Sequence, residues 1–101
     1  MNRPVPMATR LAGTRIGENL SSWRKLTGIT SQQLADRAAV SRATISRLEN
    51  GDTSVSLATF LNVCRALAVL DPVVTATDPY ETDLGRARAD QILPQRIRRP
   101  R

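Results

Sequence analysis

The 101-residue sequence has few of the residues from which metal, redox and disulfide sites are built. It has no histidine and a single cysteine, Cys64, so an internal disulfide is impossible and a His/Cys zinc site is close to excluded. We therefore predict no metal and no cofactor. The lack of disulfides fits a cytoplasmic protein. With no histidine, no nucleophile motif and no glycine-rich phosphate loop, the sequence does not indicate an enzyme.

Aromatic residues are also scarce, at 3% of the sequence. The core must therefore be built from Leu, Ile, Val and Ala, which suits a helical bundle of one small domain. No apolar run approaches the roughly 18 residues of a membrane span. The N-terminus lacks the apolar region of a secretory signal. We expect no membrane partner.

Positive charge is in excess, with a net charge of +6 and a pI near 11.2. Such an excess indicates a polyanionic partner, nucleic acid first and an anionic membrane surface second. Lys25 is the only lysine, and all other basic residues are arginines. Arginine forms bidentate hydrogen bonds to phosphate and guanine that lysine cannot form.

The first part of the chain predicts an arm and one helix. Residues 1–13 contain two prolines and no sustained period, and we interpret them as a flexible arm. Thr14 is a plausible N-cap and Gly28 a plausible stop for a helix over about 15–26. Its apolar residues, spaced as on one helical face, are Ile16, Leu20 and Trp23.

Capping signals predict the next helices. Thr30 followed by Gln33 is a capping box that begins a helix over about 31–38. Ser41 caps a third helix, which ends at Gly51 and buries Ile45 and Leu48. Ser56 caps a fourth helix with a wide apolar stripe, so that we expect it to be the most buried. The stripe consists of Leu57, Phe60, Leu61, Cys64 and Leu67.

Residues 71–101 differ in character and form an extension. Asp78 and Pro79 predict the start of a helix over about 79–92. Its narrow apolar face carries Tyr80, Leu84 and Ala87, which are either a cap on the preceding domain or an interface for a second copy or another protein. The remaining tail is basic, with Arg96, Arg98, Arg99 and Arg101. It is either a solvated end or a further contact with the DNA backbone or with an acidic partner.

The second and third helices are joined by so short a connection that they must cross steeply. That is the helix-turn-helix arrangement, whose second helix can enter a major groove about 12 Å wide. The stretch VSRATISRLENG and the Leu-Ala pair of the second helix resemble the Xre-type helix-turn-helix family of Cro and the lambdoid phage repressors. The resemblance covers residues 14–70. It implies an all-α, lambda-repressor-like five-helix domain with a C-terminal helical or extended tail.

This resemblance also implies roles for individual residues. The third helix would face DNA bases and phosphates with Ser41, Arg42, Ala43, Thr44, Ser46 and Arg47. The start of the second helix would contact phosphate through Thr30, Ser31 and Gln33, and Asn50 would do so beyond the third helix. Arg42 or Arg47 would bond guanine, and Ala43 would touch a thymine methyl group.

Arg24 and Glu49 occupy positions where the family often has an internal ion pair, which would be structural. Two residues depart from the family pattern. Ser31 stands where the family commonly has Gln, and its shorter side chain would reach phosphate through water. Ala39 stands where the turn commonly has Gly, so a left-handed backbone there would be strained.

The function that we predict is a double-stranded DNA-binding transcriptional regulator, a repressor acting as a homodimer whose half-sites lie about 34 Å apart. Residues 71–101 would form the dimer. One alternative is an antitoxin that represses its own operon and binds a toxin through residues 71–101; the stretch DLGRARADQILPQRIRR is similar to extensions of Xre-type regulators, including HipB-like antitoxins. Another is a protein-interaction adaptor that does not bind DNA.

Overall fold

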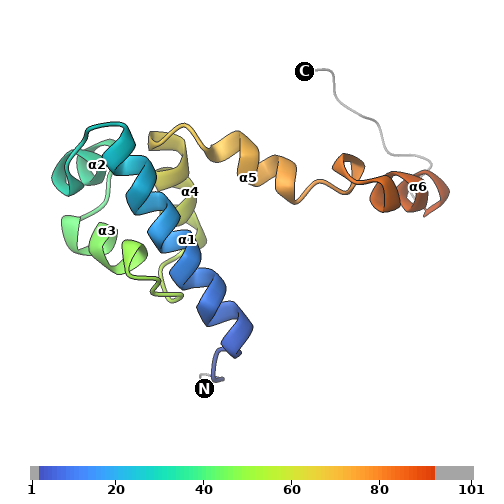
Figure 1. The fold of residues 1–101 in the computed structure, drawn as a ribbon, viewed down its shortest axis with the longest axis horizontal. Helices are drawn as coiled ribbons and strands as arrows, with labels where there is room; N and C mark the ends of the chain where they lie inside the picture. Colours follow the sequence, from blue (N-terminus) through green and yellow to red (C-terminus); the bar gives the residue numbers. More distant parts are fainter. Residues whose placement is uncertain (1–2, 93–101) are drawn as a thin grey trace. The chain divides into compact units, whose positions relative to one another are not determined.

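Six α-helices and one short 3-10 helix make up the secondary structure of residues 3–92, which are the residues that the computed structural model describes (Figure 1). No strand occurs within this range, and the all-α fold class predicted from the sequence is confirmed. The chain divides into two compact units, Met1–Leu70 and Asp71–Arg101. Each unit is described by itself below. The arginines of the basic tail lie outside the described residues.

Helix α1 spans Met7–Leu26, so the predicted start near residue 15 is wrong, and much of the expected arm is helical. Pro6 occupies the N-cap position, and its carbonyl oxygen accepts a hydrogen bond from the backbone N–H of Arg10 at 3.0 Å. The following Met, Ala, Arg and Leu residues are good helix formers. Thr14, the expected cap, instead lies inside the helix, where its hydroxyl donates to the carbonyl of Arg10 at 3.2 Å.

The buried side of α1 differs from the predicted apolar stripe. Leu20 is buried, but Ile16 is 42% exposed and Trp23 is 46% exposed. The reason is a close backbone contact at Gly17, where an added Cβ would lie 2.6 Å from the carbonyl oxygen of Leu48. The side of α1 that contains Gly17 therefore faces the end of the third helix, and the stripe lies beside the contact instead of within it.

Helices α2 (Ser31–Ala38) and α3 (Arg42–Glu49) form the predicted pair, and their predicted caps are confirmed. The connection between them turns at Ala39, which has φ 57° and ψ 41°. This left-handed conformation lets the backbone N–H of Val40 donate to the carbonyl of Ala35 at 3.0 Å. The pair buries the side chains of Leu34, Ala35, Ala38, Ile45 and Leu48.

Helix α4 spans Leu57–Ala66 and begins at the predicted cap, Ser56, whose hydroxyl accepts from the N–H of Thr59 at 3.1 Å. It packs against α2, with Val63 and Cys64 fully buried. The predicted stripe is only partly right, because Leu57 is 69% exposed.

The second unit contains α5 (Leu70–Ala76), a 3-10 helix η1 (Pro79–Glu81) and α6 (Asp83–Ile92). Helix α5 was not predicted from the sequence; Pro72 lies in its first turn, where proline is tolerated. The predicted single helix over about 79–92 is also wrong. Thr82 interrupts it with an extended backbone and caps α6, its hydroxyl accepting from the N–H of Gly85 at 2.9 Å.

Gly85 explains how η1 packs on α6. An added Cβ would collide with the carbonyl oxygen of Pro79 and would lie 2.6 Å from the hydroxyl of Thr82. Only glycine leaves room for this contact, which buries Tyr80 and Ala89. The three residues predicted for an interface are therefore separated, because Tyr80 is buried whereas Leu84 and Ala87 are exposed.

Candidate nucleic-acid interface

Helix α3 has one apolar and one polar face. Ile45 and Leu48 are buried on the first. The opposite side is exposed and carries Arg42, Ala43, Ser46, Arg47 and Asn50. Two apolar anchors thus hold a short helix so that its polar side chains and one methyl group are presented to solvent.

The first turn of α3 is fixed by its cap. The hydroxyl of Ser41 accepts from the backbone N–H of Thr44 at 3.1 Å, and the two hydroxyl groups are hydrogen bonded at 2.8 Å. Arg42 is exposed and, within residues 3–92, has no ion-pair partner. At this end of the helix, Arg42 is therefore the side chain with donors to spare.

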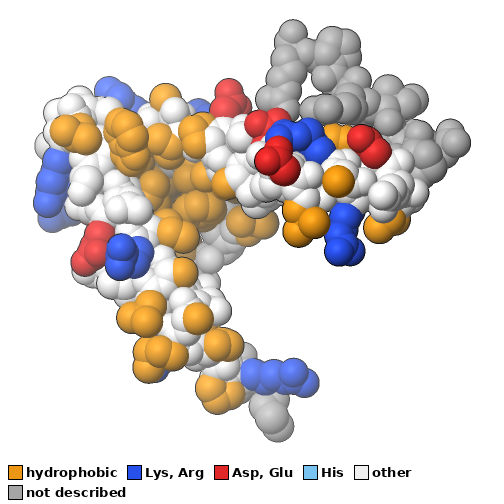
Figure 2. Space-filling view, turned by 45° about the vertical axis from the view of Figure 1, so that its right-hand side comes forward, with side chains coloured by type: hydrophobic (Ala, Val, Ile, Leu, Met, Phe, Trp, Pro, Cys, Tyr) orange, Lys and Arg blue, Asp and Glu red, His pale blue; other side chains and the backbone are white. Residues whose placement is uncertain are grey.

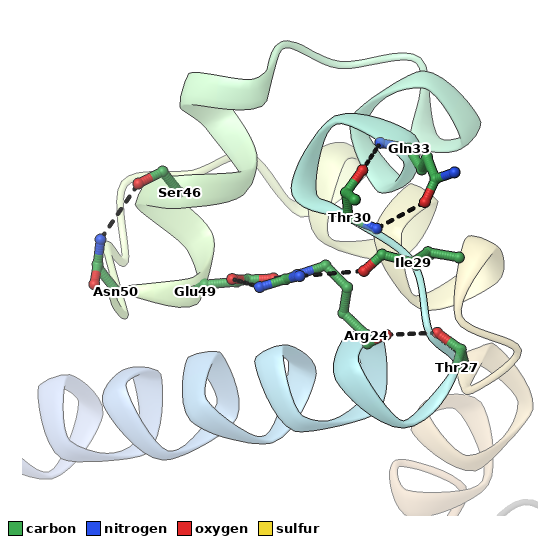
Figure 3. A network of polar contacts seen from close by, with 8 residues as sticks. All are labelled: Arg24, Thr27, Ile29, Thr30, Gln33, Ser46, Glu49 and Asn50. Carbon is green, nitrogen blue, oxygen red and sulfur yellow. Dashed lines mark hydrogen bonds and ion pairs between the residues drawn. The ribbon is translucent and has the colours of Figure 1, made fainter.

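The start of α2 offers a second set of donors. The capping box uses the side-chain oxygen of Gln33, which accepts from the N–H of Thr30 at 2.8 Å. Figure 3 shows the amide nitrogen of Gln33 pointing away from this bond, so it can donate to another group. Backbone N–H groups at a helix start attract anions. Ser31 is half-buried beside them.

A polar recess of about 370 Å³ connects α1, α2 and α3. It contains two residues that the sequence analysis missed, Ser21 and Lys25. They are four residues apart, one helical turn, and flank Arg24. Their spacing on one face of α1, and the fact that Lys25 is the only lysine of the chain, could have indicated from the sequence that they belong to the site. The full lining is Ser21, Arg24, Lys25, Ser31, Arg42, Ser46, Glu49 and Asn50.

Arg24 and Glu49, the expected ion pair, form one wall of this recess (Figure 3). Nε and Nη2 of Arg24 donate to the two carboxylate oxygens at 2.7 and 3.1 Å, and Nη1 donates to the carbonyl of Ile29 at 3.2 Å. Both side chains are 14% exposed. The hydrogen bonds that Arg24 donates to Glu49 raise the pKa of Arg24. The pair joins α1, the α1–α2 connection and α3, and it neutralises an acid close to the exposed face of α3.

Arg47 differs from Arg42 because it is paired. Its Nε donates to Asp52 at 2.8 Å, and its Nη2 donates to the hydroxyl of Ser54 at 2.9 Å. The two arginines are therefore not equivalent: Arg42 is exposed and has no ion-pair partner within residues 3–92, whereas Arg47 is bonded to the loop that follows α3.

The first unit also has an apolar groove of about 320 Å³. It lies between the N-terminal half of α1 and the α3–α4 connection, and its lining includes Ile16, Val55 and Phe60. Figure 2 shows apolar side chains gathered along this part of α1. A DNA backbone needs hydrogen-bond donors and positive charge. The polar recess supplies both, whereas the lining of the groove includes Asp52 and no lysine or arginine.

Residues 3–92 contain no cluster of three or more metal-ligating side chains. No helix within the same range is long and apolar enough to cross a membrane.

An all-helical unit in which a tight turn joins two short helices, with the polar face of the second exposed, defines a helix-turn-helix protein of the DNA-binding class. Residues 15–77, more than half of the sequence, match the family described as helix-turn-helix domain. The chain belongs to this family, which supports a DNA-binding regulator. The match reaches beyond residue 70 and therefore includes α5. Comparisons with curated proteins and with solved structures found no match.

Proposed function

We propose that the protein is an Xre-type regulator of transcription that binds a specific double-stranded DNA sequence. Helix α3 enters the major groove, and the recess beside it receives the phosphate backbone. The observation that supports this proposal most is the placement of Arg42. It is exposed, unpaired within residues 3–92, and part of the same recess as Lys25 and the start of α2.

In this arrangement, Arg42 donates to guanine O6 and N7, and Ala43 touches a thymine methyl group. Ser46 and Asn50 lie further along the same exposed face. Gln33, Ser31 and Thr30 contact phosphate at the start of α2. Ser41 and Thr44 are engaged with each other, and their contribution is to fix the first turn of α3. Occupancy of the operator then represses transcription.

The test is to select preferred duplexes from a random pool, and then to measure binding to the selected and random sequences at several salt concentrations. Arg42→Ala should weaken binding to the selected sequence by about 5- to 150-fold, which corresponds to about 1–3 kcal/mol for a bidentate base contact. Arg37→Ala is the control, because it removes the same charge from the last turn of α2, at the end away from the recess. It should change the affinities for selected and random sequences equally and only slightly. Binding without any sequence preference would refute the proposal.

A dimer gives such a small helix enough contact with DNA, with half-sites about 34 Å apart. We propose that residues 71–101 supply the interface. Leu84 is 66% exposed and Ile92 is 69% exposed. Ile92 also lines an apolar pocket of about 240 Å³, together with Pro79, Gly85 and Ala89. Leu84→Glu should convert the dimer to a monomer in analytical ultracentrifugation, with Glu81→Gln as the control on the same unit.

The same exposed apolar side chains support a second candidate function, that of an antitoxin whose residues 71–101 bind a toxin. A toxin gene next to the gene for this protein, and a complex that survives purification, would favour it. A homodimer that captures no partner would contradict it. An adaptor that does not bind DNA predicts that Arg42→Ala combined with Arg47→Ala leaves function intact.

A further inference from the structure

Arg47 is exposed, but its guanidinium group is held in place. It lies in the last turn of α3, with its side chain 51% exposed. Its Nε and Nη2 donate to Asp52 and Ser54, both in the loop that follows the helix, at 2.8 and 2.9 Å. An exposed arginine without partners samples many rotamers, and these bonds select one of them.

Asp52 is fixed by the loop itself. Its Oδ1 accepts from the backbone N–H of Ser54 at 2.9 Å and from the hydroxyl of Ser54 at 2.6 Å, which is an Asx-turn. The other oxygen, Oδ2, is left for Arg47. Two hydrogen bonds lower the pKa of Asp52: the bond from the hydroxyl of Ser54 has the larger effect, and the bond from Arg47 the next largest. The carboxylate is charged at neutral pH. The three side chains form a closed ring of hydrogen bonds.

This ring leaves one edge of the guanidinium group available. The group has five N–H donors, of which Nε–H and one N–H of Nη2 are used. The remaining donors, two on Nη1 and one on Nη2, include a parallel pair. Such a pair can donate to guanine O6 and N7, or to two phosphate oxygens. Arg47 can therefore bind DNA without releasing Asp52.

We propose that Asp52 and Ser54 are positioning residues that hold Arg47 in one orientation and thereby increase discrimination between DNA sequences; this rests on the proposed function. The carboxylate acts in two ways. It offsets the charge of Arg47, which weakens attraction to phosphates of any sequence. It also fixes the direction of the free N–H pair, which favours a base with matching acceptors.

Asp52→Asn separates the turn from the pairing. An Asn oxygen can still accept from Ser54, but its amide nitrogen then faces the donor Nε of Arg47. The variant should bind random duplexes more tightly, with a salt slope steeper by up to about 0.9, because the freed arginine neutralises one phosphate. The ratio of affinities for selected and random sequences should fall about two- to tenfold, the cost of ordering one long side chain on binding.

Asp36→Asn is the matched control. Asp36 is exposed on α2, where its side chain accepts from Gln32 at 2.9 Å, and it has no ion pair within residues 3–92. Removing its charge should raise both affinities together and leave their ratio unchanged. In an Arg47→Ala background, Asp52→Asn should also leave the ratio unchanged, because the arginine that it positions is absent.

A measurement without DNA tests the positioning directly. In NMR spectra of the free protein, the Nε–H of Arg47 should be ordered, and Asp52→Asn should make it as mobile as that of Arg42. The positioning role is overturned if Arg47 is already mobile in the wild-type protein, if Asp52→Asn keeps the wild-type ratio, or if its effect persists without Arg47. If Arg42→Ala lowers the ratio of affinities for selected and random sequences while Asp52→Asn leaves that ratio unchanged, the proposed function stands and only this inference fails. A wild-type protein without sequence preference overturns both.

Discussion

Ala39 is a strained residue at the centre of the helix-turn-helix, and replacing it with glycine should stabilise the protein. Its φ of 57° and ψ of 41° lie in the left-handed region. An L-residue in that conformation is disfavoured by about 1–2 kcal/mol. Ala39 is exposed, so that losing its methyl group removes no core packing.

The expected gain is smaller than the strain itself. Glycine makes the unfolded chain more flexible, and this opposes folding by about 0.4–1 kcal/mol. The net stabilisation from Ala39→Gly is therefore about 0.5–1 kcal/mol. For a unit of this size, that corresponds to a rise in Tm of about 2–8 °C. The backbone hydrogen bond from Val40 to Ala35 is retained, so the crossing of α2 and α3 should not change.

Urea unfolding measures this effect as a higher midpoint at an unchanged slope. Ala12→Gly is the control. Ala12 is exposed inside α1, where the exchange to glycine should destabilise the protein by about 0.5–1 kcal/mol. Ala68, with φ 60°, should behave like Ala39. A variant Ala39→Gly with unchanged or reduced stability would show that the turn is not strained, and the reasoning would fail.

Two further substitutions test the structure by the same assay, and a thiol-labelling experiment tests the burial of Cys64. Arg24→Ala leaves the carboxylate of Glu49 largely buried without its partner, and should cost about 3 kcal/mol; the exposed pair of Arg47 is the comparison, and losing it should cost less than about 1 kcal/mol. Gly17→Ala should destabilise by about 1–2 kcal/mol although alanine favours helix, because the backbone oxygens of α3 cannot move aside; a stabilised variant would contradict the close contact. Burial raises the pKa of the Cys64 thiol, so its neutral form contributes stability that is complete below about pH 8.5 and is lost as the pH rises through the raised value. Labelling of Cys64 by a thiol reagent at pH 8 should therefore proceed only through unfolding, and rapid labelling of the native protein would contradict its burial.

The features that could be predicted from the sequence depend on residues close together in the chain. A cap such as Ser41 or Ser56 bonds a backbone N–H three residues ahead. Its effect is therefore visible in a short stretch of sequence. The same holds for the box of Thr30 and Gln33, which begins α2. The cap positions also set where α2 and α3 begin and therefore how long they are. Because the connection between the two helices is short, they must cross steeply.

The features that could not be predicted depend on what approaches from elsewhere in the fold. Gly17 looks like a weak point of a helix, but the oxygens of α3 lie where a side chain would be. Gly85 has the same explanation in the second unit. The start of α1 was misjudged for a different reason. Threonine is a residue type that often caps helices, and no neighbouring residue in the sequence argues against a cap at Thr14. Lys25 and Ser21 were missed because their place beside α3 is a tertiary contact.

Under the proposed function, the acids near α3 bear on a question that the sequence left open, namely which arginine makes the stronger base contact. Glu49 is neutralised by Arg24, and Asp52 is neutralised by Arg47. Without these pairs, two negative charges would oppose the approach of a phosphate backbone. With them, Arg47 has part of its charge offset and Arg42 has not. Arg42 should therefore contribute most to attraction and contact, whereas Arg47 contributes direction. Under the proposed function, two arginines five residues apart on one helix thus have different tasks, because the acid of the following loop pairs with Arg47.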